Sequence, residues 1–98
     1  MQEQVKFWLA RDFENMEMMR ATFITHAYTP HTHDEYAIGI LERGAEAFDY
    51  RRRHWVAPGG TIVIINPGEV HTGHAADERG WTYRMLYPSV TLMRWLLR

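Results

Sequence analysis

The chain has 98 residues and a mass of 11.6 kDa, which is the size of one domain. Its 11 Lys and Arg against 12 Asp and Glu give a net charge of −1, so the basic excess usual in a free-standing nucleic-acid binder is missing. A hydrophobic content of 46% excludes disordered and low-complexity classes, and the lack of Cys excludes disulfides and thiolate metal sites.

Short apolar, β-branched and aromatic stretches run through most of the chain and predict strands. We expect these strands at residues 5–9, 18–27, 36–41, 45–50, 54–56, 61–65 and 81–87. Arg43-Gly44 predicts a tight turn between two of them, and the prolines and glycines at 58–60 and 66–68 predict breaks. Short strands separated by regular turn signals are typical of an all-β sandwich or small barrel.

The last segment changes to a helical period. Ser89 is a plausible N-cap, and the apolar residues that follow at helical spacing are Val90, Leu92, Met93, Leu96 and Leu97. A helix this short is unstable alone, so we expect it to pack on the barrel or on a partner and to favour a homodimer. We therefore divide the chain into a barrel, residues 1–88, and the start of a helical dimerisation or linker segment, residues 89–98. The chain stops at Arg98 without a C-cap signal, and we expect a longer parent protein.

Histidines supply the first candidate site. His31 and His33 are two residues apart, so in an extended segment they point to the same side. If His71, which follows a Pro-Gly turn, faces them, three neutral imidazoles converge and could bind a divalent metal, Zn or Ni. Glu35 and His74 are candidate fourth ligands. The alternative is a pair of surface histidines and a turn residue without a shared role.

A ligand pocket is the second candidate site. Ala37 and Gly39 share a face with the first two histidines if the strand is continuous, and small inward side chains leave a void. Trp81, Tyr83 and Met85 alternate along the last strand and would line one wall. Aromatic faces with polar donors suit a sugar or an aromatic metabolite as the effector. The alternative is that these three residues are core.

The spacing of the histidines and of three glycines resembles the two motif blocks of the cupin family. The matching residues are His31, His33 and Gly44 in the first block and Gly60, Gly68 and His71 in the second. The departures are that the family's metal-binding Glu falls at Ala37, its proline at Asn66 with Pro67 one position later, and its closing Asn at Ala75. The carboxylate ligand is therefore missing from its usual place, and Glu35 lies two residues early.

Most of the chain, residues 18–90, resembles the N-terminal sensor domain of AraC-type transcription regulators. The resemblance lies in the segments HTHDEYAIGILERG (31–44), PGGT (58–61), NPGEVHTG (66–73) and GWTYRMLYP (80–88). It implies a cupin-like barrel, of the double-stranded β-helix or jelly-roll type, that binds a small effector, and a following helix that supports dimerisation. It also implies two helix-turn-helix units nearer the C-terminus, so we expect DNA contact only through a part outside this chain.

Three functions remain open. The leading one is a non-enzymatic sensor and dimerisation domain of a regulator, which needs no cofactor. The second is a metal-dependent cupin enzyme of the dioxygenase or isomerase type, which Ala37 in place of the carboxylate weakens. The third is a dimerisation module with a vestigial pocket, which a convergent set of histidines weakens. No apolar run reaches the roughly 18 residues of a membrane span and the polar N-terminus is unlike a signal peptide, so we expect a cytoplasmic protein.

Overall fold

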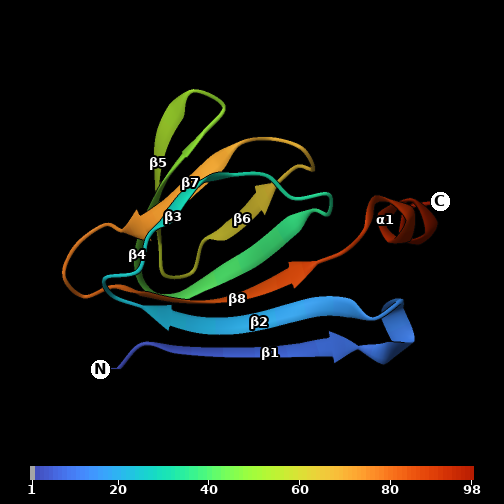
Figure 1. Cartoon of the computed structure of the whole chain (residues 1–98), viewed down its shortest axis with the longest axis horizontal. Coiled ribbons are helices and arrows are strands. Elements are labelled where there is room, and N and C mark those ends of the chain that lie inside the picture. Colours follow the sequence, from blue (N-terminus) through green and yellow to red (C-terminus); the bar gives the residue numbers. More distant parts are fainter. Residues whose placement is uncertain (1) are drawn as a thin grey trace.

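The described residues form two sheets that face each other as an open half-barrel, with one helix at the C-terminal end (Figure 1). The computed structural model describes residues 2–98. Within them the strands are β1 (Gln4–Ala10), β2 (Met16–Phe23), β3 (Tyr28–His31), β4 (Ala37–Tyr50), β5 (Arg53–Pro58), β6 (Ile62–Ile65), β7 (His71–Ala75) and β8 (Trp81–Tyr87). The helix is α1 (Val90–Leu96), and a 3₁₀ turn at Arg11–Phe13 joins β1 to β2. The predicted all-β architecture with a short C-terminal helix is confirmed.

Strand β4 belongs to both sheets. Its first half pairs with β6 and β8, and its second half pairs with β5 and β7, all antiparallel. One sheet therefore runs β1-β2-β8-β4-β6, and the other runs β3-β7-β4-β5. Sharing one long strand holds the two sheets around a common interior.

The expected tight turn at Arg43-Gly44 is wrong, because β4 runs through it. The register between β4 and β8 shifts between Leu41 and Arg43, as at a β-bulge, and Gly44 has φ +72°. A bulge adds one residue to the strand, so the inward-facing parity changes from odd numbers before it to even numbers after it. Leu41 points into the core before the bulge, and Phe48 points into it afterwards.

Two strands, β3 and β7, were not expected from the sequence. β3 is four residues long and contains a proline, and β7 is rich in His, Thr and Gly, so neither carries a β-branched apolar run. They pair with each other, and β7 also pairs with the second half of β4. This pairing forms the wall that carries two of the histidines.

Aromatic and sulfur side chains fill the core between the sheets. Trp81, Met19 and Leu41 are the largest fully buried side chains. Phe23 packs against Trp81 and Tyr83, with ring centroids 5.3 and 6.2 Å away. Burial of aromatic area of this kind supplies much of the stability of a small domain.

Helix α1 begins with the predicted cap. The Ser89 hydroxyl accepts a hydrogen bond from the Leu92 amide at 2.9 Å, and Leu92 is 5% exposed. Trp95, Leu96 and Leu97 remain exposed, so only one side of the helix is packed. In residues 2–98 no helix combines the length and the apolar character that a membrane crossing requires.

Candidate functional site

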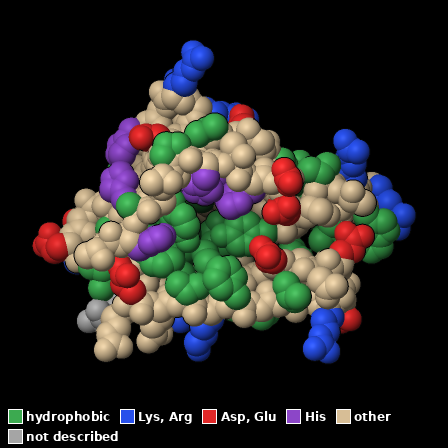
Figure 2. All heavy atoms as spheres, viewed as in Figure 1, with side chains coloured by type: hydrophobic (Ala, Val, Ile, Leu, Met, Phe, Trp, Pro, Cys, Tyr) green, Lys and Arg blue, Asp and Glu red, His purple; other side chains and the backbone are tan. Residues whose placement is uncertain are grey.

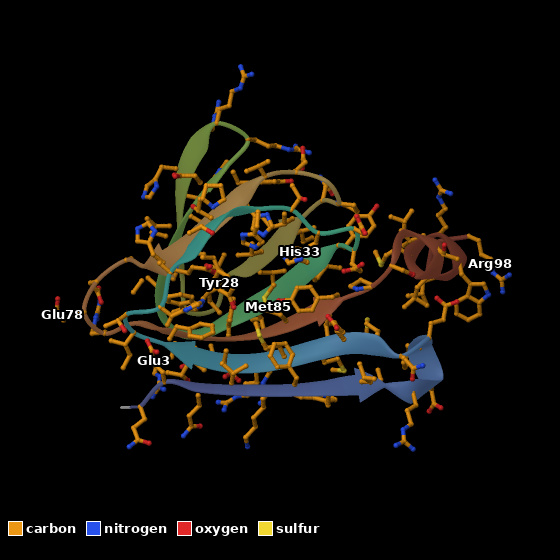
Figure 3. The ribbon with its side chains drawn as sticks, in the orientation of Figure 1. Glu3, Tyr28, His33, Glu78, Met85 and Arg98 are labelled. Atoms are coloured by element: carbon orange, nitrogen blue, oxygen red, sulfur yellow. The ribbon has the colours of Figure 1, made fainter. Side chains whose placement is uncertain are left out.

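A small cavity lies between the two sheets. Its volume is about 70 Å³, room for about five water molecules. Figure 3 shows Tyr28, His33 and Met85 gathered around this interior, whereas Glu78 and Arg98 lie at opposite ends of the molecule. The lining residues are Tyr28, His31, His33, Ala37, Glu46, Phe48, Val63, Ile65, His71, Thr72, Tyr83, Met85 and Tyr87.

His31, His33 and His71 converge at this cavity, as the sequence predicts. Each offers a ring nitrogen, and these nitrogens all lie within 4.8 Å of one another. His31 ends β3 and His71 begins β7, and the two are direct cross-strand partners. In Figure 2 histidine side chains gather at the centre of the face, next to apolar side chains.

Backbone carbonyls fix the tautomer of two of these rings. Nδ1 of His31 lies 2.7 Å from the Thr29 carbonyl, and Nδ1 of His71 lies 3.1 Å from the Glu69 carbonyl. A carbonyl only accepts, so each Nδ1 carries the proton and each Nε2 keeps its lone pair. Such carbonyl contacts are the usual outer support of metal-binding histidines.

The turn before His71 is anchored on the first histidine pair. The Gly68 amide donates to the His33 carbonyl at 2.8 Å, and Gly68 has φ +76°, which glycine adopts readily. The Tyr50 hydroxyl donates to Glu69 and accepts from the Asn66 amide. The Asn-Pro-Gly-Glu segment therefore ties the strand ends of β6 and β7 to the loop after β3.

The environment favours the neutral form of His33 and His71. Burial, and then the neighbouring His31, lower the pKa of His33 below its ordinary value. Burial is also the largest cause that lowers the pKa of His71, and the hydrogen bond that His71 donates to the Glu69 carbonyl opposes it. Neutral imidazoles are the form that binds metals or accepts hydrogen bonds from a ligand.

The donor set fits a divalent ion after a small adjustment. Three Nε2 or Nδ1 atoms around a tetrahedral Zn stand about 3.3 Å apart when each bond is 2.0–2.1 Å long. The ring nitrogens lie within 4.8 Å of one another, so rotations of the side chains that bring them closer by at most about 1.5 Å would close the site. His31, His33 and His71 would hold the ion.

Neither candidate fourth ligand joins this group in the part of the chain that the structure describes. Glu35 lines a separate hollow together with Glu17 and Leu92. His74 is exposed, and its ring lies beside His54 with centroids 6.2 Å apart. It is three residues from His71 on one strand, so the two side chains point to opposite faces.

Two of the expected pocket residues do not line the cavity. Trp81 is 1% exposed and packs in the core against Phe23 and Tyr83. Gly39 sits under Met85: a Cβ there would overlap the Met85 sulfur, so the missing side chain makes room for methionine and not for a ligand. Ala37, Tyr83 and Met85 do line the cavity.

The most informative lining residue that sequence reasoning missed is Glu46. It is 8% exposed, and burial raises its pKa to about 8. The sequence does contain a clue to this position: Glu46 lies two residues before Phe48 on one strand, so both side chains face the same side of the sheet. Tyr28 and Tyr87 were missed as well, and burial raises the pKa of both hydroxyls.

Comparison with known families gives one match over most of the chain. A family model described as the AraC-like ligand binding domain matches residues 15–98. An uncharacterized HTH-type transcriptional regulator of Bacillus subtilis (strain 168), YbfI, is 26% identical over 72 residues. That alignment covers 74% of this chain but only 26% of the regulator, so the chain spans about a quarter of that relative's length.

Solved structures show the same fold. A cupin-like protein from Thermotoga maritima superposes with a TM-score of 0.77 at 23% identity, over 90% of this chain and 69% of that one. A predicted oxalate decarboxylase from the same organism gives 0.78 at 13% identity, over 90% and 81% of the two chains. The predicted cupin-like fold is confirmed by these similarities.

Proposed function

This chain belongs to the family of AraC-like ligand binding domains, and from that premise we propose that it is the effector-sensing and dimerisation domain of a DNA-binding transcription regulator. The main support for this proposal is the cavity between the sheets, which combines an apolar and aromatic lining with converging polar groups. The similarity to an HTH-type regulator almost three times as long as this chain supports a separate DNA-binding part. The effector is a small molecule, a sugar or an aromatic metabolite.

Thermal unfolding with a metabolite library tests the sensing role. A ligand that binds only the folded state raises Tm by mass action. We expect at least one compound to raise the Tm of the wild type and to lose this effect in Ala37→Met, which fills the cavity. The matched surface variant Glu78→Gln should respond like the wild type. A compound that stabilises the filled variant equally would place the binding site elsewhere.

Edge strand β1 supports the dimer. It is the last strand of its sheet in the described chain, so one row of its backbone groups has no strand partner there. Val5, Phe7 and Leu9 are exposed on one face of β1, and Trp8 is exposed on the other. Strand β6 is a shorter edge with two exposed isoleucines. We therefore propose that a second copy of the chain pairs along β1.

A metal-dependent enzyme is the second candidate, because the three histidines fit a divalent ion, Zn or Ni. A bound ion would supply a Lewis acid and an activated water. Sensing is favoured over catalysis because Ala37 stands where cupins have their metal-binding carboxylate, and alanine has no side-chain donor atom for a metal. We propose that the domain is not an enzyme. Turnover of small carboxylic acids by the Zn- or Ni-loaded chain, lost in His71→Ala, would favour the enzyme instead.

A further inference from the structure

The inner wall of the cavity carries a carboxyl group without a partner. Glu46 lines the cavity and is more than nine-tenths buried. Among the described residues it has no hydrogen bond and no ion pair, and burial is the one cause that shifts its pKa. Buried carboxyl groups are normally paired, because desolvation without a partner is costly.

The fold makes space for this side chain. A Cβ at Gly73 would lie 2.6 Å from Oε2 of Glu46, so an alanine on β7 would push the carboxyl group aside. Glu46 is paired in register with Ala75 on β7 and with Ala57 on β5, two further small residues. The carboxyl group is thus accommodated by its neighbours although none of them binds it.

The electrostatic surroundings favour a cation. The lining contains no Lys or Arg among the described residues. Glu17 and Glu35 lie near enough to His33 to raise its pKa against burial. Figure 2 shows acidic side chains around the central histidines and basic ones at the periphery of this face. A ligand carboxylate or phosphate would therefore meet no permanently positive side chain in this lining, whereas an ammonium group would meet a carboxyl group that can ionise to pair with it.

The remaining wall suits a compact aromatic body. Tyr28, Tyr83 and Tyr87 line the cavity with Phe48, and burial raises the pKa of all three hydroxyls, so they stay neutral. Neutral aromatic faces also attract ammonium groups through their quadrupole. The small volume limits the effector to about one ring.

We propose that the effector is a one-ring aromatic amine whose ammonium group pairs with Glu46 at the inner end of the cavity. This rests on the proposed sensing function and narrows its ligand class. The ammonium group supplies the positive partner that the carboxyl group lacks, and the tyrosines and Phe48 contact the ring. The histidine cluster also lines the cavity, and His71 pairs with Tyr50, four residues further along β4 than Glu46, so the cluster is left for the remaining polar groups of the effector.

Calorimetric titration with three matched probes tests the proposal: benzylamine, benzyl alcohol and benzoate, which carry a positive, a neutral and a negative group on the same ring. We expect the wild type to bind benzylamine at least tenfold more tightly than benzyl alcohol, and benzoate more weakly than either. Glu46→Gln should abolish the preference for benzylamine and leave the affinity for benzyl alcohol unchanged. Gly73→Ala, which displaces the carboxyl group, should reduce the same preference.

Glu78→Gln is the matched control, since it removes an equal charge from an exposed turn. It should bind like the wild type, and thermal unfolding should show that all variants are folded. Equal affinity of the wild type for the amine and the alcohol would overturn the amine assignment alone. An unchanged preference in a folded Glu46→Gln would also overturn it. Binding of none of the probes to the wild type would overturn both this inference and the aromatic-ligand pocket.

Discussion

His31 and His71 face each other across the β3–β7 pair as direct register partners, with ring centroids 4.2 Å apart. Each ring is held by its Nδ1 contact to a carbonyl two residues earlier in its own strand or turn. His33 lies close to both, at centroid distances of 4.9 and 5.2 Å. The cluster is therefore pre-oriented, with its lone pairs available to a shared partner.

We expect the chain to bind Zn or Ni through this cluster, and His71→Ala to weaken binding at least tenfold in calorimetry. Binding should fall below about pH 6, because protonated imidazole cannot ligate. The lowered pKa values of His33 and His71 delay this loss as the pH falls. His74→Ala, which alters an exposed outward ring, is the control and should bind like the wild type. Equal heats for the wild type and His71→Ala would contradict the prediction.

Glu46 should make the stability of the empty domain fall with rising pH. Its pKa rises from 4.5 to about 8 on folding, so the folded state holds the proton more tightly over that interval. The free energy of unfolding should then decrease by about 1.4 kcal/mol per pH unit through that window. Urea unfolding at pH 5, 6.5 and 8 should show this slope in the wild type and a smaller one in Glu46→Gln. Comparing the two proteins cancels the opposing histidine contribution. Parallel slopes would contradict the prediction.

Gly44 should be intolerant of a side chain. A Cβ there would overlap the Gly80 carbonyl oxygen, and the φ of +72° is strained for any other residue. We expect Gly44→Ala to cost more than about 3 kcal/mol in urea unfolding. Gly60→Ala is the control: its φ is +89°, but the added Cβ meets nothing within 4 Å. It should cost about 1 kcal/mol, from backbone strain alone. Equal costs would show that packing at the bulge is unimportant.

Dimerisation should depend on β1. Phe7 is 66% exposed on this edge strand, and a charge there would have to be buried in a β1–β1 interface. We expect Phe7→Glu to lower the dimer fraction in analytical ultracentrifugation, while Val70→Glu, which changes an exposed apolar residue in a turn, leaves it unchanged. A wild-type chain that stays monomeric at high concentration would defeat the idea.

The chain alone should not recognise duplex DNA. Its net charge is −1, and α1 is the one α-helix in residues 2–98, seven residues long and without a helix-turn-helix partner. We expect no sequence-specific shift at sub-micromolar concentration in a gel titration of this chain. A specific complex with the chain alone would contradict this prediction.

The sequence was a good guide where a local rule applies. Period-two patterns predicted most of the strands, and Ser89 was correctly predicted as the N-cap of α1. The two-residue spacing of His31 and His33, together with the turn before His71, predicted the histidine cluster. These features depend on residues close together in the chain. The resemblance to a known family supplied the expectation that distant segments meet.

Long-range pairing was harder to predict. Arg43-Gly44 looks like a hairpin turn but is a bulge, because β8 and β5 both pair with the continuous strand. The bulge also changes which residues face inward, so Glu46 could not be placed by extending the alternation from Ala37. The alternation of Trp81 with Tyr83 predicts that both line the pocket. Strand β8 extends beyond the cavity, however, and Trp81 at its start packs against Phe23 in the core.

Tyr87 connects the cavity directly to the helix. It lines the cavity as the last residue of β8, and only Pro88 and Ser89 separate it from the first turn of α1. The proline ring restricts the φ of Pro88, and the Pro88 carbonyl accepts a hydrogen bond from the Tyr36 amide at 3.0 Å. The link between β8 and α1 is therefore conformationally restricted. A ligand that displaces the Tyr87 ring would therefore shift the start of helix α1 relative to the two sheets.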